Sequence, residues 1–167
     1  LSSKYVKNGS KYPKKLKIIN ETIKLDSKIN KIIGQSVVRK GIKKLLIFGL
    51  SYKSNLKVHI LSPTLQLIDY LNKNSISVTL YDPLYTKNEI DRIIKVKTIN
   101  KISSLNKFDG IIMMINHKSF KNLNLIKLIK KSKLKMILDN LNFFKDKKKL
   151  IPSKTSYIQT GQAGWLD

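Results

Sequence analysis

KKLLIFGLSYKSNLKVHILSP, residues 43–63, decides the fold of this chain. It begins with an apolar run, Leu45–Phe48, that predicts a buried β-strand, and Gly49 then predicts a turn. A loop carrying Tyr52–Lys53 follows, and Ser62–Pro63 is typical of a helix start. A parallel strand that leads into a helix places the intervening loop at the carboxyl end of the sheet, where open α/β folds bind ligands. We therefore expect the chemistry of this chain in that loop.

The rest of the sequence alternates between short apolar runs and segments with helical spacing. The predicted strands that follow are Ile76–Leu80, Ile111–Ile115, Met136–Leu138 and an edge strand at Ser156–Thr160. Shorter features are a helix before Arg92, a strand near Val96, a helical turn at Ser103–Asn106, a helix at Leu123–Ile129 and a solvated basic turn at Lys145–Lys149. Such alternation predicts an α/β fold, a Rossmann-like three-layer sandwich with a mainly parallel sheet of about five strands.

A long amphipathic helix is predicted ahead of this sheet. Apolar residues recur at helical spacing from Ile18 to about Gly34 or Val38. Such a stripe needs a partner surface, and packing on its own domain and contact with a second subunit are both open. We divide the chain into residues 1–40, the N-terminal segment with this helix, and residues 41–167, the α/β domain.

Polar residues follow the carboxyl ends of the predicted strands: Asp82, Asn116 with His117, and Asp139. The sheet should gather them beside Lys53. Each of them has an alternative role as a cap or turn residue, and for Asp82 before Pro83 we favour that role. His117 has neither a nucleophile nor a set of metal ligands near it in sequence, which is typical of a loop histidine. Tyr52 and Lys53 differ, because an aromatic face and a flexible ammonium suit a base and a phosphate.

Composition limits the possible functions. The formal net charge of +24 suggests nucleic acid, but 32 of the 34 basic residues are lysine, spread along the whole chain, and base readout favours arginine. We expect nonspecific polyanion affinity and no dedicated nucleic-acid site. The absence of cysteine excludes disulfides, thiolate metal sites and a cysteine nucleophile, and no metal is expected. Without a transmembrane run or a signal-peptide pattern, we expect a cytoplasmic protein with no membrane contact.

GLSYKSN at Gly49–Asn55, followed by Ser62–Pro63, is the most specific motif in the chain. It resembles the opening of the C-terminal domain of the UDP-glucose/GDP-mannose dehydrogenase family, which typically reads G-[LF]-[AST]-[FY]-K-x-[ND] and then S-P. Ile19–Glu21 resembles a segment of the long helix that links the family's two domains and forms its dimer. Later landmarks also occur in the family's order: Tyr81–Pro83, Phe108–Gly110, Asn116–Phe120 and Asp139.

The resemblance implies a nucleotide-sugar site with Tyr52 and Lys53 as substrate-binding residues and Asn55, His117 and Asp139 as weaker candidates. Full-length members use NAD and an active-site cysteine to oxidise a UDP-sugar to a UDP-uronic acid. This chain has no G-x-G-x-x-G fingerprint, no cysteine and no P-K-D motif. We therefore expect that it binds no cofactor and holds no catalytic residue. It is expected to start just after the catalytic segment, as a fragment or as one half of a split enzyme.

Two departures from the family pattern weaken the expected site. The family usually has an acidic pair and an arginine before S-P, where this chain has Lys57, Val58 and Ile60; many members also have an arginine where this chain has Asn140–Asn142. Each lost charged hydrogen bond removes about 1.5–3 kcal/mol, so we expect weak UDP-sugar binding centred on Lys53. The other expected partner is a second copy, as a homodimer, or the missing catalytic half. A standalone non-catalytic binding or association domain is the alternative, and a basic nucleic-acid-binding protein is less favoured.

Overall fold

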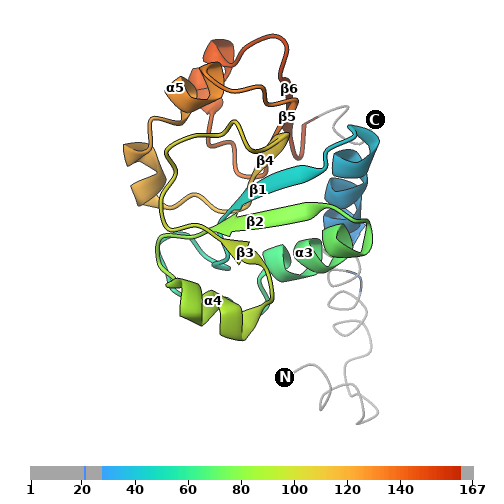
Figure 1. The fold of residues 1–167 in the computed structure, drawn as a ribbon, viewed down its shortest axis with the longest axis vertical. Helices are drawn as coiled ribbons and strands as arrows, with labels where there is room; N and C mark the ends of the chain where they lie inside the picture. Colours follow the sequence, from blue (N-terminus) through green and yellow to red (C-terminus); the bar gives the residue numbers. More distant parts are fainter. Residues whose placement is uncertain (1–20, 22–27, 163–167) are drawn as a thin grey trace.

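Six parallel strands form one sheet in the order β3-β2-β1-β4-β5-β6 (Figure 1). The structure, a computed structural model, describes residue 21 and residues 28–162. The strands are β1 Lys44–Phe48, β2 Ser77–Tyr81, β3 Lys97–Thr98, β4 Gly110–Met113, β5 Met136–Asp139 and β6 Ser156–Gln159. This arrangement confirms the predicted α/β, Rossmann-like fold.

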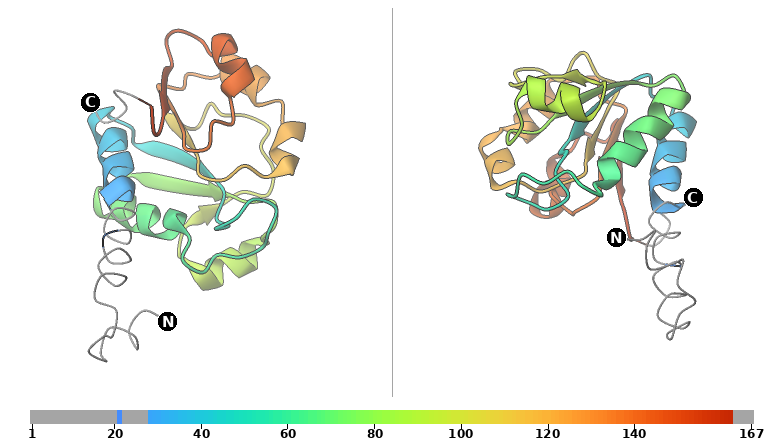
Figure 2. Two further views of the ribbon diagram at one scale, coloured as in Figure 1. Left: turned by 180° about the vertical axis from the view of Figure 1, so that it is seen from behind. Right: turned by 90° about the horizontal axis from the view of Figure 1, so that it is seen from below.

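Helices cover both faces of the sheet (Figure 2). A helix over residues 28–39, α3 (Pro63–Lys73) and α4 (Lys87–Ile93) pack on one face. The other face carries the 3₁₀ helix η1 (Lys118–Asn122), α5 (Leu125–Lys130) and the 3₁₀ helix η2 (Lys145–Leu150). Each face has its own cluster of buried apolar side chains, so the molecule is a three-layer sandwich.

The side chains of β1 are buried on both faces of the sheet, so helices must pack against both faces. Leu45 and Ile47 belong to the apolar cluster under α3, whereas Leu46 and Phe48 belong to the cluster under α5. Successive side chains of a strand point to opposite faces, and all four of these are fully buried. Such a run of consecutive buried apolar residues is typical of a central parallel strand.

Local sequence signals place the ends of the helices. The Ser62 hydroxyl accepts the Thr64 N–H, and Pro63 is the first residue of α3, as predicted. α4 begins with a capping box, in which Thr86 and Glu89 exchange hydrogen bonds. These caps fix where α3 and α4 begin, and the parallel strands β1 and β2 place the loops before them at the carboxyl edge of the sheet.

Gly34 brings the helix over residues 28–39 close to α3, which lies beside it (Figure 2). A Cβ at Gly34 would fall 2.3 Å from the ring of Tyr70 in α3. Ile33 and Val37 are buried against the sheet, so this part of the predicted long helix packs on its own domain. Ile29 and Ile32 are half-buried, and Ile29 packs against the same apolar cluster. The predicted apolar positions from Ile18 to Leu25 lie outside the described residues.

Some details differ from the predictions. The strand predicted near Val96 is present as β3, which pairs with β2, and with it the sheet has six strands rather than about five. The helical turn predicted at Ser103–Asn106 is wrong, since that segment contains no helix. The basic segment predicted as a turn forms the short helix η2, none of whose residues is buried. Within the described residues, no helix has both the length and the apolar character needed to cross a bilayer.

Candidate functional site

The strand order reverses between β1 and β4. From β1 the chain moves outward through β2 and β3, then returns to β4 and moves the other way through β5 and β6. Doubly wound sheets bind ligands at such a reversal, at the carboxyl ends of the two strands. The loop after β1, residues 49–62, lies at this position and is called the β1 loop below.

Gly49 lets the β1 loop leave the sheet directly beside β4. Its φ is 102°, and a Cβ there would lie 1.9 Å from a side-chain carbon of Ile115. The Thr64 hydroxyl donates to the Gly49 carbonyl at 2.9 Å, which joins the start of the loop to the start of α3. A larger residue at position 49 would therefore displace the loop.

Asp82 holds the β1 loop from the end of β2. Its buried carboxylate accepts hydrogen bonds from the N–H groups of Leu50 and Ser51, at 2.8 and 3.0 Å, and from the Ser51 hydroxyl at 3.1 Å. The other oxygen accepts the Leu84 N–H at 2.9 Å. Burial works against ionisation, but the hydrogen bonds from His117 and these N–H groups outweigh it and lower the pKa of Asp82. Asp82 is thus a turn residue, as favoured above, and also a long-range anchor.

His117 is buried, and both of its ring nitrogens have partners. Nδ1 accepts the Asn55 N–H at 2.9 Å, so the ring proton lies on Nε2, which is 3.2 Å from the Asp82 carboxylate. The Asn55 side chain accepts the Lys118 N–H at 2.7 Å, and asparagine tolerates its φ of 61°. In this arrangement His117 positions the β1 loop and offers no free nitrogen to a ligand.

Tyr52 and Lys53 lie at the exposed part of the β1 loop. The Tyr52 side chain is 60% exposed and Lys53 is also exposed. Backbone bonds close the loop: the Tyr52 N–H donates to the Val58 carbonyl at 2.6 Å, and the Leu56 N–H donates to the Lys53 carbonyl at 3.3 Å. Within the described part of the chain, neither the tyrosine hydroxyl nor the Lys53 ammonium makes a hydrogen bond or ion pair. Both groups are available to a ligand.

Lys57, by contrast, is already engaged. Its ammonium lies 2.5 Å from the Glu89 carboxylate and 5.4 Å from the centre of the Tyr85 ring. The hydrogen bond from Lys57, with those from the N–H and hydroxyl of Thr86, lowers the pKa of Glu89 to about 2. This exposed pair joins the β1 loop to α4, and it leaves Lys53 as the uncommitted cation of the Tyr52–Val58 turn.

Asp139 belongs to a separate network at the end of β5. Its buried carboxylate accepts the N–H groups of Phe143 and Phe144, at 2.8 and 2.9 Å, and the Tyr157 hydroxyl at 2.8 Å. Burial, together with this hydrogen bond to Asp139, raises the pKa of Tyr157. Asp139 therefore holds residues 140–144, called the β5 loop below, and within the described residues it shares no hydrogen bond with the β1 loop.

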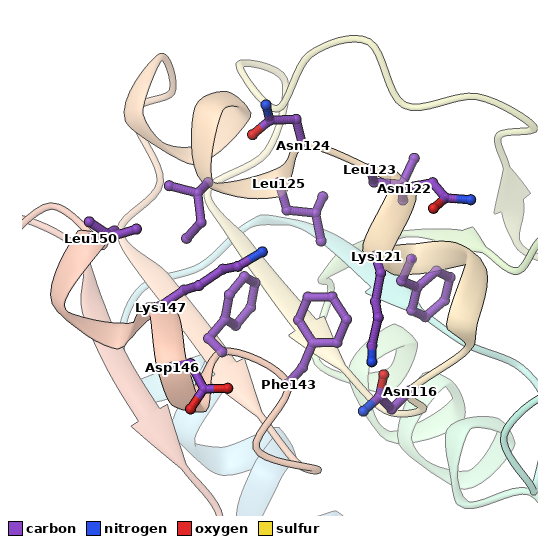
Figure 3. A pocket seen from close by; sticks show the side chains of 13 residues that line it. Asn116, Lys121, Asn122, Leu123, Asn124, Leu125, Phe143, Asp146, Lys147 and Leu150 are labelled. Atoms are coloured by element: carbon purple, nitrogen blue, oxygen red, sulfur yellow. The ribbon is translucent and has the colours of Figure 1, made fainter.

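A pocket of about 660 Å³ lies between the η1–α5 segment and the segment that follows β5 (Figure 3). Phe143 lies in it, with Lys121 of η1 on one side of the ring and Lys147 of η2 on the other (Figure 3). Asn116 also lines this pocket, and its buried Oδ1 has no partner within the described residues. The pocket is a concave feature at the carboxyl side of the sheet that no single sequence motif predicts.

The structure brings together part of what the sequence suggested. Asn55, His117 and Asp82 form one connected group beside Lys53, whereas Asp139 serves the β5 loop. The hydrogen bonds between Asp82 and the β1 loop were not predicted from the sequence, because they can be foreseen only when β1 and β2 are known to be neighbours. The one sequence feature that pointed to them was a polar residue directly after β2. Among the described residues, no His, Asp and Glu side chains are grouped so as to hold a metal ion.

Comparison with known proteins gives consistent matches. The model of the UDP-binding domain of the UDP-glucose/GDP-mannose dehydrogenase family matches residues 46–146. The UDP-N-acetyl-D-mannosamine dehydrogenase of Methanococcus aeolicus is 35% identical over 79 residues, which are 47% of this chain and 17% of that protein. The family match at residues 46–146 covers the whole β1 loop, residues 49–62.

Solved structures show the same fold. The native UDP-N-acetyl-mannosamine dehydrogenase of Staphylococcus aureus matches with a TM-score of 0.56 at 21% identity, over 85% of this chain and 32% of that chain. The UDP-D-ManNAc dehydrogenase of Pyrococcus horikoshii matches with a TM-score of 0.51 at 20% identity, over 77% and 28% of the respective chains. This chain thus spans less than a third of the length of the proteins that it matches.

Proposed function

This chain belongs to the UDP-glucose/GDP-mannose dehydrogenase family, as its UDP-binding domain, and from that premise we propose that its β1 loop binds the diphosphate and base of a UDP-sugar. Lys53 would pair with the diphosphate and Tyr52 would face the base. The observation that carries this proposal is the exposure of these two side chains on a loop that Asp82 and His117 hold at the β1–β4 reversal.

Two features of the β1 loop predict that its affinity for UDP is weak. The Leu50 and Ser51 N–H groups, which could otherwise face a phosphate, already donate to Asp82. Lys57 is paired with Glu89, so one ammonium remains. A lysine acts as a point charge, and at 0.1 M salt its field is screened over about 10 Å. We infer a modest affinity that falls with salt.

NAD does not fit the β1 turn of this chain. A dinucleotide turn needs several glycines and free backbone N–H groups to approach the pyrophosphate. Here Gly49 is followed by Leu50 and Ser51, whose N–H groups Asp82 occupies. We propose that any NAD used by the complete protein binds outside this domain.

The activity of the complete protein is a proposal as well. In it, this domain holds the nucleotide while another part oxidises the sugar of the UDP-sugar to a UDP-uronic acid with NAD. We propose that the chain is a fragment or one half of such an enzyme, that residues 1–40 link it to the remainder or to a second copy, and that it acts in the cytoplasm.

A non-catalytic association domain is the second candidate, and one observation favours it. Leu56, Ile60 and Leu61 of the β1 loop are 53%, 69% and 85% exposed. Apolar side chains that cluster on one exposed loop are typical of a contact surface. Sedimentation of the parent chain and of Ile60→Lys with Leu61→Lys separates the two roles: a mass that falls in the double variant, with no UDP binding in either protein, favours association alone.

The proposed function is tested by calorimetric titration of UDP. Loss of the Lys53 ammonium removes a charge-assisted hydrogen bond, so Lys53→Ala should weaken binding about tenfold or more. Lys43→Ala makes the same charge change at the opposite edge of the sheet and should leave the affinity unchanged. Equal binding by both variants and the parent would refute the proposal.

A further inference from the structure

The pocket between η1–α5 and η2 has a chemistry of its own. Its wall contains Phe120, Phe143 and Phe144, whose rings meet edge to face with centroids 6.4 Å apart for the first pair and 4.9 Å for the second. Small-molecule sites commonly have volumes of about 300–1,000 Å³, and this pocket lies within that range at about 660 Å³. Its lining combines the aromatic wall with polar and charged side chains.

The aromatic wall is fixed before any ligand binds. The N–H groups of Phe143 and Phe144 both donate to the buried Asp139 carboxylate. On the opposite side, the ring of His117 packs against that of Phe120 with centroids 5.1 Å apart, and His117 is held by Asp82. A preformed wall reduces the ordering cost of binding, because the residues are already in place.

Two unpaired cations face this wall. Lys121 and Lys147 both line the pocket on either side of the Phe143 ring (Figure 3), and both are exposed. Within the described residues, neither ammonium has a carboxylate partner. Asp146 is the one acidic residue among those that line the pocket. Because two lysines line it as well, the pocket has a net positive charge. Phenylalanine faces favour a flat ring, and two ammonium groups favour an anion of about two charges.

We propose that this pocket is a second ligand site, distinct from the β1 loop, that binds a small aromatic phosphate. The ring lies against Phe143, and the phosphate lies between Lys121 and Lys147. The site is separate because η1 stands between the two: its Lys118 N–H contacts the β1 loop through Asn55, while Lys121 faces the pocket. Nothing in the proposal depends on UDP binding at Lys53.

Phenyl phosphate, titrated against the folded chain by ligand-observed NMR, tests the site. Lys121→Ala and Lys147→Ala should each weaken binding about fivefold or more, as expected for a charge-assisted hydrogen bond. Lys118→Ala and Lys149→Ala are matched controls, because each lies in the same short helix as its counterpart but outside the pocket lining. Both controls should bind like the parent.

Three further variants in the same titration test the role of each group in the pocket. Phe143→Leu keeps apolar volume but removes the ring face, so it should weaken phenyl phosphate and leave inorganic phosphate unchanged. Asp146→Asn removes a repelling charge and should tighten binding. Lys53→Ala should have no effect, which distinguishes this site from the β1 loop. Equal losses in all four lysine variants, equal affinity for phenyl phosphate and inorganic phosphate, or dependence on Lys53 would each overturn the proposal.

Discussion

The β1 loop and the β5 loop are each held by a buried aspartate, but from different directions. Asp139 ends β5 and accepts N–H groups from the loop that follows it, no more than 5 residues away. Asp82 follows β2 and accepts N–H groups from a loop 31 and 32 residues earlier in the chain. The first is a local turn, whereas the second exists only because β1 and β2 are neighbours in the sheet. An aspartate directly after a strand can therefore hold either the loop that follows that strand or the loop that follows the neighbouring strand.

The largest effects should come from removal of the two carboxylates. Asp82→Ala and Asp139→Ala each leave several buried N–H groups without an acceptor, at about 1–3 kcal/mol per group. We expect the free energy of unfolding to fall by about 3 kcal/mol or more in either variant, measured by urea denaturation. Asp82→Ala should also abolish UDP binding, whereas folded Asp139→Ala should retain it. Retention of UDP binding in Asp82→Ala would break the distinction between the loops.

Acid titration tests the charge on Asp82. Because its pKa is lowered in the folded protein, its stabilisation is complete above the unfolded pKa of about 3.9 and is lost as the pH falls through the folded value. Asp82→Asn should therefore show a shallower loss of stability below about pH 4 than the parent. Parallel curves for Asp82→Asn and the parent would contradict this role.

The next effect concerns His117, whose ring accepts the Asn55 N–H of the β1 loop. His117→Ala leaves the Asn55 N–H without its acceptor and opens a space beside Phe120, so we expect a loss of about 2 kcal/mol. Hydrogen exchange at the Asn55 amide should accelerate more than at the Phe143 amide, which Asp139 holds. An equal acceleration at both amides would show that His117 supports the whole sheet rather than this loop.

A smaller effect is expected in the network of the β5 loop. Tyr157→Phe removes one hydroxyl donor from Asp139 but leaves its three N–H donors from the loop, so the free energy of unfolding should fall by about 1–2 kcal/mol. Tyr52→Phe removes an exposed hydroxyl and serves as the control, with an unchanged stability. If Tyr157→Phe also weakened UDP binding, the two loops would be coupled.

The smallest effect should be a gain in stability within the β1 loop. Leu61 is 85% exposed and has a φ of 62°, a conformation that favours glycine. Leu61→Gly should therefore raise the free energy of unfolding by about 0.5 kcal/mol. Leu56→Gly, at an exposed residue of the same loop without positive φ, should lower it. A loss in Leu61→Gly would mean that this side chain contributes contacts to the folded state.

Local sequence signals predicted most of the fold. The continuous apolar run of β1 and the Ser62–Pro63 cap of α3 depend on residues close in sequence, and both were predicted. The short strand β3 was predicted only as a strand near Val96, without bounds, because two residues carry no periodic pattern. The helical turn at Ser103–Asn106 was wrong, because propensity alone does not decide such short segments.

The candidate site was less predictable. Tyr52 and Lys53 are visible as a motif because they lie in one loop, whereas the contact between Asp82 and His117 joins residues 35 apart. The wall of the pocket near η2 requires the β5 loop to hold Phe143 and Phe144 in place. Asp139 holds them by accepting their N–H groups, a contact that the sequence does not show. Side chains from separate segments become one surface only after the strand order is known.

The most direct test of the account is a two-dimensional ¹H–¹⁵N NMR titration of the chain with UDP. We predict the largest shifts at the amides of Leu50–Asn55 in the β1 loop and at Lys118, which contacts Asn55. The amides of Phe143–Lys147 should shift less at the same UDP concentration. The largest shifts at Phe143–Lys147, or small shifts spread evenly over the lysine surface, would contradict a nucleotide site on the β1 loop.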